Sequence, residues 1–236
     1  MEGPFFYWYA VVPRGSLSQD PKNPYPVGIS SSQLLPLRID DLEAVVSSIA
    51  VRRLDPEPSL IISHEQVVDW LLEATTFRVL PFRFGTIMAN VEEVIETLRT
   101  HSGSWTKVLN RVAGCVEMSL KVLWTPPSLS VEIPPLPSPY LSKRAQERAQ
   151  QEALTSTAKV IVETIHRRLG PLYIRNRGTL LEQPRLLMTG AYLVEERVIS
   201  AFRDTVRKLI EEFPEYHWMC SGPWPPYHFV SEGDAE

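Results

Sequence analysis

The sequence of 236 residues contains only two cysteines, Cys115 and Cys220, and no C-x-x-C pair. A disulfide framework or a zinc site is therefore not indicated, and we expect both thiols to be reduced. No apolar run reaches the roughly 18 residues of a membrane-spanning helix. The apolar run at residues 5–12 follows no basic segment, so it predicts a strand and not a signal peptide. We expect a protein of the cytoplasm without a membrane span.

Positive charge is also scarce, because 24 Lys and Arg stand against 28 Asp and Glu, for a net charge of −4. This balance argues against nucleic acid as a partner. Glycine-rich nucleotide loops and the G-x-S-x-G motif are missing, and Cys115 opens an apolar strand, which favours a structural thiol. The five histidines are not spaced for a shared metal on a helix: His64, His101, His166, His217 and His228. We predict no cofactor, metal or catalytic residue; an enzyme with an unrecognised site is the alternative.

What is present suffices for a folded core, since 44% of the residues are hydrophobic and 22% are charged. Ser63 to Gln66 form a capping-box pattern that predicts a helix start. The hydrophobic periodicity predicts strands at 5–12, 79–87 and 115–124, and helices at 63–77, 91–98 and 105–112. Residues 42–51 mix apolar with small residues and are interpreted as a strand, with a short helix as the alternative. This order predicts a small α+β domain with its helices on one side of an antiparallel sheet.

Six prolines within residues 125–139 predict a semi-rigid linker, so we expect domains at 1–125 and 140–236 joined by a linker at 126–139. The second domain is again expected to be α+β, with a helix at 141–169, strands at 172–174 and 186–194 around a polar turn at 175–178, a helix at 198–213 and a strand at 216–220. In residues 142–152 only Ala145 and Ala149 are apolar. We expect this N-terminal half of the long helix to project beyond the second domain or to contact the first domain.

Two charged residues stand alone in predicted apolar strands. Arg83 lies between Phe82 and Phe84, and Glu117 lies between Val116 and Met118. A buried charge without a partner costs several kcal/mol, about as much as a strongly destabilising mutation. We therefore predict that Arg83 and Glu117 form an ion pair that fixes the fold.

The C-terminal tail, residues 222–230, reads Gly-Pro-Trp-Pro-Pro-Tyr-His-Phe-Val. Its prolines predict an extended, polyproline-II-like ribbon with no ordinary helix or strand. Each of its three aromatic side chains can bury about 150–250 Å². The tail either docks on its own chain, with Trp224 and Phe229 in grooves, or is offered to a partner. Docking is favoured, because no basic residue flanks the P-x-x-P from Pro223 to Pro226.

Several segments together resemble the gas vesicle accessory protein family F/L: residues 79–87, 114–117 leading into 120–124, 191–194 and 221–230, with His64 near Val67 and Val68. The resemblance implies an α+β fold of two domains, an N-terminal ferredoxin-like one and a C-terminal modified ferredoxin-like one, followed by an extended Pro/aromatic tail. The motif residues are Pro81, Arg83, Phe84, Gly85, Glu117, Gly222, Pro223, Trp224, Pro225, Pro226, Tyr227 and Phe229.

The resemblance also implies a non-enzymatic function. Such a protein is a minor structural component or assembly factor of gas vesicles, the protein shells that give buoyancy, located in the gas vesicle and the cytoplasm. It is expected to bind the small hydrophobic major shell protein, and other accessory proteins, and to limit aggregation in a chaperone-like manner. The Pro-rich stretch at residues 13–28 and the inter-domain linker depart from the family pattern and leave types F and L both open.

Overall fold

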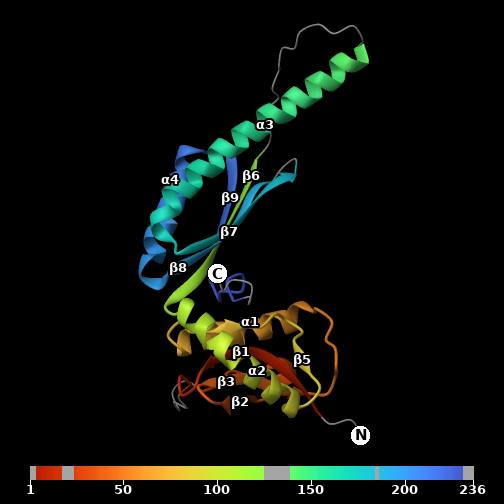
Figure 1. Cartoon of the computed structure of the whole chain (residues 1–236), viewed down its shortest axis with the longest axis vertical. Helices are drawn as coiled ribbons and strands as arrows, with labels where there is room; N and C mark the ends of the chain where they lie inside the picture. Colours follow the sequence, from red (N-terminus) through yellow and green to blue (C-terminus); the bar gives the residue numbers. More distant parts are fainter. Residues whose placement is uncertain (1–3, 18–23, 125–138, 184–185, 231–236) are drawn as a thin grey trace. The chain divides into compact units, whose positions relative to one another are not determined.

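The structure, a computed structural model, describes residues 4–17, 24–124, 139–183 and 186–230. It is an α+β protein whose strands form two antiparallel sheets (Figure 1). The chain divides into unit 1, with Met1–Glu117 and Pro223–Glu236, and unit 2, with Met118–Gly222. These bounds differ from the predicted domains, because residues 118–124 belong to unit 2 and most of the tail belongs to unit 1. Apart from Pro139, the predicted linker lies outside the described residues.

The central strand of unit 1 is β1 (Phe5–Pro13). It pairs antiparallel with β3 (Leu42–Ile49) on one side and with the short strands β4 (Leu80–Pro81) and β5 (Ile87–Met88) on the other. Strand β2 (Leu34–Ile39) pairs with β3 at the edge. Residues 7–12 are all buried, which confirms the prediction of a central strand covered on both faces.

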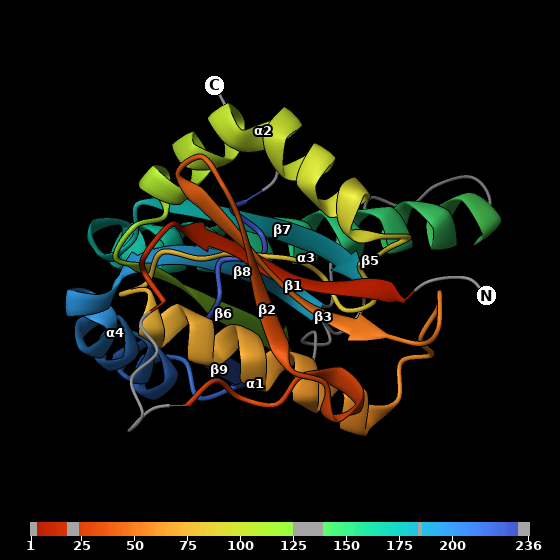
Figure 2. The same cartoon turned by 90° about the horizontal axis from the view of Figure 1, so that it is seen from below.

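Helices α1 (Pro58–Ala74) and α2 (Val91–Arg111) lie on opposite faces of this sheet (Figure 2). The ring of Tyr7 lies 5.6 Å from that of His64 in α1, whereas the ring of Trp8 lies 5.8 Å from that of Trp105 in α2. Successive strand side chains point to opposite faces, so the two helices cover different faces. The predicted one-sided arrangement is wrong, because β1 carries large side chains on both faces.

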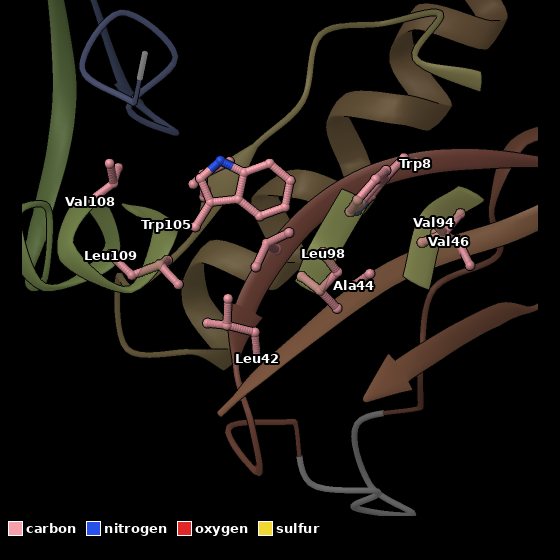
Figure 3. Packing of buried hydrophobic residues seen from close by; sticks show 11 residues of the cluster. Trp8, Leu42, Ala44, Val46, Val94, Leu98, Trp105, Val108 and Leu109 are labelled. Carbon is pink, nitrogen blue, oxygen red and sulfur yellow. The ribbon is translucent and has the colours of Figure 1, made fainter. Parts of the chain in front are cut away.

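The core on the α2 face is continuous from strand to helix (Figure 3). The two tryptophans, Trp8 and Trp105, meet edge to face at its centre. Around them pack aliphatic side chains from β3, β4 and α2: Leu42, Ala44, Val46, Leu80, Val94, Leu98, Val108 and Leu109. Their spacing in α2 keeps one apolar stripe along the whole helix.

Both helices of unit 1 differ from their predicted bounds. Helix α1 begins at Pro58, which occupies the first helical turn, where a missing N–H costs nothing. Ser63 is therefore inside the helix and not its cap; its hydroxyl donates to the Ser59 carbonyl over 2.9 Å. Helix α2 is continuous through Gly103, whereas two pieces were predicted, because its buried stripe continues on both sides of this residue.

The strand predicted at residues 79–87 is interrupted by a turn between β4 and β5. Within it the Thr86 amide donates to the Arg83 carbonyl over 3.2 Å. Gly85 has φ +86°, a conformation that glycine adopts without steric cost. Strand β2 was not predicted; its Pro36 is tolerated because β2 is an edge strand.

The sheet of unit 2 has the strand order β7-β8-β6-β9 in the described part of the chain. Its strands are β6 (Cys115–Trp124), β7 (Arg175–Gln183), β8 (Leu186–Glu195) and β9 (Tyr216–Trp224). Helices α3 (Pro139–Leu169) and α4 (Ile199–Glu212) share one face, since Tyr192 contacts both His166 of α3 and Phe202 of α4. Short 3-10 turns are η1 (Ile29–Ser31), η2 (Gly170–Leu172) and η3 (Glu196–Val198).

Strand β6 has the predicted bounds, but it belongs to the second sheet and not to the first. The turn predicted at residues 175–178 is the start of β7, with Arg175 opposite Leu193 and Gly178 opposite Gly190. Its polar composition misled the prediction, because an edge strand can carry polar side chains. The strand predicted at 172–174 is not formed, because Leu172 ends η2 and residues 173 and 174 connect η2 to β7.

The first half of α3 reaches beyond the sheet of its own unit (Figure 1). Ala145 and Ala149 are only half-buried there. This agrees with the expectation that the thin apolar stripe of residues 142–152 does not enter the core.

Candidate functional site: the tail-docking site of unit 1

The last part of the tail, residues 225–230, packs into unit 1 after β9 ends at Trp224. It folds into a tight turn, in which the Tyr227 amide donates to the Pro225 carbonyl (2.8 Å) and the Phe229 amide to the Pro226 carbonyl (2.9 Å). Pro225, Pro226 and Phe229 are buried. The predicted extended ribbon is therefore wrong: its first three residues, 222–224, complete β9, and the rest turns. We call the unit 1 surface that holds residues 225–230 the tail-docking site.

Glu117 is the main polar anchor of this site. Its carboxylate accepts hydrogen bonds from the His228 amide (2.9 Å) and, at 2.7 Å, meets the His228 ring Nδ1. The Glu117 side chain is 5% exposed and that of His228 is 61% exposed. A buried carboxylate that accepts two such bonds fixes both the backbone and the side chain of the tail residue.

The predicted pair of Arg83 with Glu117 is wrong. Arg83 is exposed in the turn between β4 and β5, whereas Glu117 faces the tail. The sequence suggested that both charges lie in apolar strands, but the strand ends at Pro81. Glu117 is indeed buried, and its partner is His228.

Arg111, at the end of α2, binds the tail residue that follows His228. At the last turn of α2, its Nη2 donates to the Phe229 carbonyl over 3.1 Å. The loop from α2 to β6 passes through Gly114, at φ +69°, where glycine is unstrained. This tight connection places Arg111 and Glu117 close enough to hold consecutive tail residues.

His64 is fully buried on the side of α1 that packs against β1, and the Tyr227 hydroxyl of the tail lies 3.3 Å from its Nε2. Its Nε2 is 3.1 Å from the Phe82 carbonyl, and its Nδ1 is 2.9 Å from the Tyr7 hydroxyl. A carbonyl only accepts, so Nε2 carries the proton and Nδ1 accepts from Tyr7. Burial lowers the pKa of His64 to about 4, so the imidazole is neutral at neutral pH.

Tyr227 connects the tail to this histidine. Its hydroxyl lies 3.3 Å from His64 Nε2 and 3.3 and 3.4 Å from the two oxygens of Glu65. The hydroxyl donates to the carboxylate and accepts from the imidazole N–H, which it shares with Phe82. Burial, and then the charge of Glu65, raise the pKa of Tyr227. Burial, and then the charge of Asp69, raise the pKa of Glu65.

The turn between β4 and β5 completes the site. The Gly85 amide donates to the Tyr7 hydroxyl over 3.1 Å, and the Phe84 ring lies 6.0 Å from that of His64. The two motifs singled out from the sequence, residues 81–85 and the tail, therefore meet around His64.

The outcome for the predicted tail residues is mixed. Phe229 is 1% exposed, so its predicted burial is confirmed. Trp224 keeps 40% of its surface exposed at the end of β9, so the prediction that it fills a groove is wrong. Sequence reasoning missed the roles of Tyr7, Arg111 and His228. For Tyr7 the available signal was a tyrosine hydroxyl, shared only with Tyr9, inside a central strand that is otherwise apolar.

These contacts dock a peptide segment and bring together no recognisable catalytic set. Among the described residues, no group of three or more His, Cys, Asp or Glu could hold a metal ion. Of the described helices, none combines the length and apolar composition needed to cross a membrane. The site thus belongs to an α+β protein of two units, in which the C-terminal tail packs into unit 1.

Two solved structures share this fold. The gas vesicle protein GvpF from an Anabaena species has a TM-score of 0.82 at 19% identity, over 97% of each chain. GvpF from Microcystis aeruginosa has a TM-score of 0.79 at 16% identity, over 96% of this chain and 99% of that one.

Sequence relatives agree with the structures. Gas vesicle protein F1 from Halobacterium salinarum is 24% identical over 226 residues, 95% of this chain and 92% of that protein. Gas vesicle protein F from a Nostoc species is 32% identical over 65 residues, 27% of each chain.

The family described as gas vesicle synthesis protein GvpL/GvpF matches residues 5–231. The chain belongs to this family, and the resemblance noted in its sequence is confirmed. It is a gas vesicle accessory protein.

Proposed function

We propose that this protein binds the small hydrophobic shell protein of gas vesicles and limits its aggregation during vesicle nucleation and assembly. The observation that carries the proposal is the match to the gas vesicle synthesis family over residues 5–231. The role is chaperone-like and non-enzymatic. It is carried out in the cytoplasm and at the gas vesicle, with the major shell protein and other gas vesicle accessory proteins as partners.

The tail-docking site supports a binding role better than a catalytic one. A general base works best with a pKa near the operating pH, whereas burial lowers the pKa of His64 to about 4. Both of its ring nitrogens are engaged, by Tyr7 on one side and by Phe82 and Tyr227 on the other. The hydrogen bonds of His64 and Glu117 run to other residues of the site and to the tail.

The docked tail also suits a protein that handles an apolar client. Pro225, Pro226 and Phe229 are buried in unit 1. Undocked, they would form an exposed apolar segment able to associate without specificity. Docking of the tail therefore protects this protein from aggregating through its own apolar segment.

The proposal is tested by diluting denatured shell protein into buffer with and without an equimolar amount of this protein. We expect lower light scattering, and a complex that elutes together in size-exclusion chromatography. An inert globular protein at the same mass concentration is the control. Equal scattering in the presence of either protein, with no complex, would contradict the proposed function.

A further inference from the structure

Strand β9 is an edge strand of the unit 2 sheet. In the described part of the chain it has a single strand neighbour, β6. An edge strand offers backbone N–H and C=O groups to any extended segment that reaches it. Folded proteins usually protect such edges with charged side chains or with proline.

The composition of β9 leaves this edge largely unprotected. Residues 216–222 contain no Asp, Glu, Lys or Arg and no proline; Pro223 follows near the end of the strand. The opposite edge, β7, carries Arg175 and Arg177, and the edge strand of the other sheet, β2, carries Pro36 and Arg38. In this respect β9 differs from both of these edges.

The open part of β9 is residues 217–220. Met219 is 58% exposed, and His217 and Cys220 are exposed as well. The indole N–H of Trp218 donates to the Phe213 carbonyl over 3.2 Å, so this side chain is held by its own unit. At the end of the segment, Arg203 of α4 donates to the Gly222 carbonyl over 2.7 Å and so covers the strand there.

We propose that residues 217–220 of β9 form the docking edge for the client, which adds an uncharged extended segment as a further strand of the unit 2 sheet. The inference rests on the proposed function. The absence of Asp, Glu, Lys and Arg from residues 217–220 selects the occupant, because an apolar strand can pair there without desolvating a charged side chain of β9 itself. Backbone pairing also requires no particular client sequence.

The test introduces the protection that the edge lacks. Met219→Lys places a charge in the open segment, and His217→Lys repeats this two residues away. Val160→Lys, at a side chain of α3 that is 61% exposed, is the matched control in the same unit. We expect both edge variants to weaken shell-protein binding roughly tenfold or more, since a lysine must then be desolvated, while Val160→Lys binds like the unmodified protein.

Amide hydrogen exchange on the unmodified protein gives a second readout that requires no variant. Addition of shell protein should slow exchange in residues 217–220 and leave β7 unchanged. Equal binding by all three variants, or unchanged exchange in β9, would overturn the docking edge while leaving the proposed function intact. Failure of the unmodified protein to bind shell protein would overturn both. A concentration-dependent dimer that protects β9 without shell protein would identify a second copy as the occupant and overturn the client assignment.

Discussion

At the scale of single residues, His64 shows how a polar side chain can be fully buried when both of its ring nitrogens have partners. The neutral tautomer satisfies its acceptor with the Tyr7 hydroxyl and its donor with the Phe82 carbonyl. A second proton would leave Nδ1 facing the Tyr7 oxygen in a desolvated position. Burial disfavours this second proton and lowers the pKa of His64 to about 4.

This lowered pKa predicts a pH dependence of stability. As the pH falls below 6.5, His64 of the unfolded chain takes up a proton, whereas the folded chain does so only near pH 4. The contribution of the neutral His64 to the free energy of unfolding is therefore fully present above pH 6.5. It is lost as the pH falls towards 4, and the loss reaches about 3 kcal/mol. Urea unfolding of the native protein and of His64→Gln between pH 4.5 and 7.5, on the order of one measurement per pH unit, checks this. The difference between the two should shrink at low pH; a constant difference would contradict a neutral buried imidazole.

Glu117 and Arg83 give a paired prediction at the same scale. Glu117→Gln keeps the shape of the side chain but removes the charge that accepts from the His228 amide and ring, so it should cost about 1–3 kcal/mol. Arg83→Gln changes an exposed turn residue and should stay within about 0.5 kcal/mol. Urea unfolding at pH 7 compares them. Equal losses in the two variants would restore the ion pair predicted from the sequence.

At the scale of elements, the tail divides between a strand and a docked turn. Phe229→Ala empties a buried site and should cost about 3–5 kcal/mol. Trp224→Ala removes a side chain that is 40% exposed and should cost about 1 kcal/mol. Denaturant midpoints of the two variants test this ranking. A larger loss for Trp224→Ala would show that the indole, and not Phe229, is the main anchor.

The elements that the sequence predicts well are those with a strong hydrophobic period. Strands β1 and β6, helix α4 and the second half of α3 lie where predicted, because their apolar spacing determines their burial. Strand β3 also lies where a strand was predicted, although its sequence left a short helix open. The errors arise where a local signal competes with tertiary context. The capping-box pattern at Ser63 lies in mid-helix, and the polar start of β7 was mistaken for a turn.

The candidate site was predicted in its parts but not in its connections. The buried charge at Glu117 and the burial of Phe229 follow from local sequence, whereas residues 81–85 were singled out through the resemblance to the family. The bonds from Glu117 to His228 and from Arg111 to Phe229 join residues 111 and 118 positions apart. A single sequence contains no signal for contacts over such separations.

At the scale of the whole molecule, unit 2 is inserted into unit 1 along the chain. The chain leaves unit 1 within β6, after Glu117, and returns to it at Pro223, within β9; these two strands are neighbours in the sheet. Unit 1 is therefore complete only when the end of the chain has docked. The tail is part of the core of unit 1, although it follows the last strand of unit 2.

Removal of residues 225–236 separates this structural role of the tail from a direct role in client binding. We expect the truncated chain to lose stability in unit 1, because Glu117 and the layer around His64 lose their cover, while the helices and strands of unit 2 keep theirs. Hydrogen exchange should accordingly speed up in α1 and β1 and stay unchanged in α4 and β8. Shell-protein binding should persist at temperatures where hydrogen exchange shows that unit 2 is still folded, since the proposed docking edge at residues 217–220 is then still present. Unchanged exchange in unit 1 together with lost binding would show the opposite, that the tail itself is the segment offered to the client.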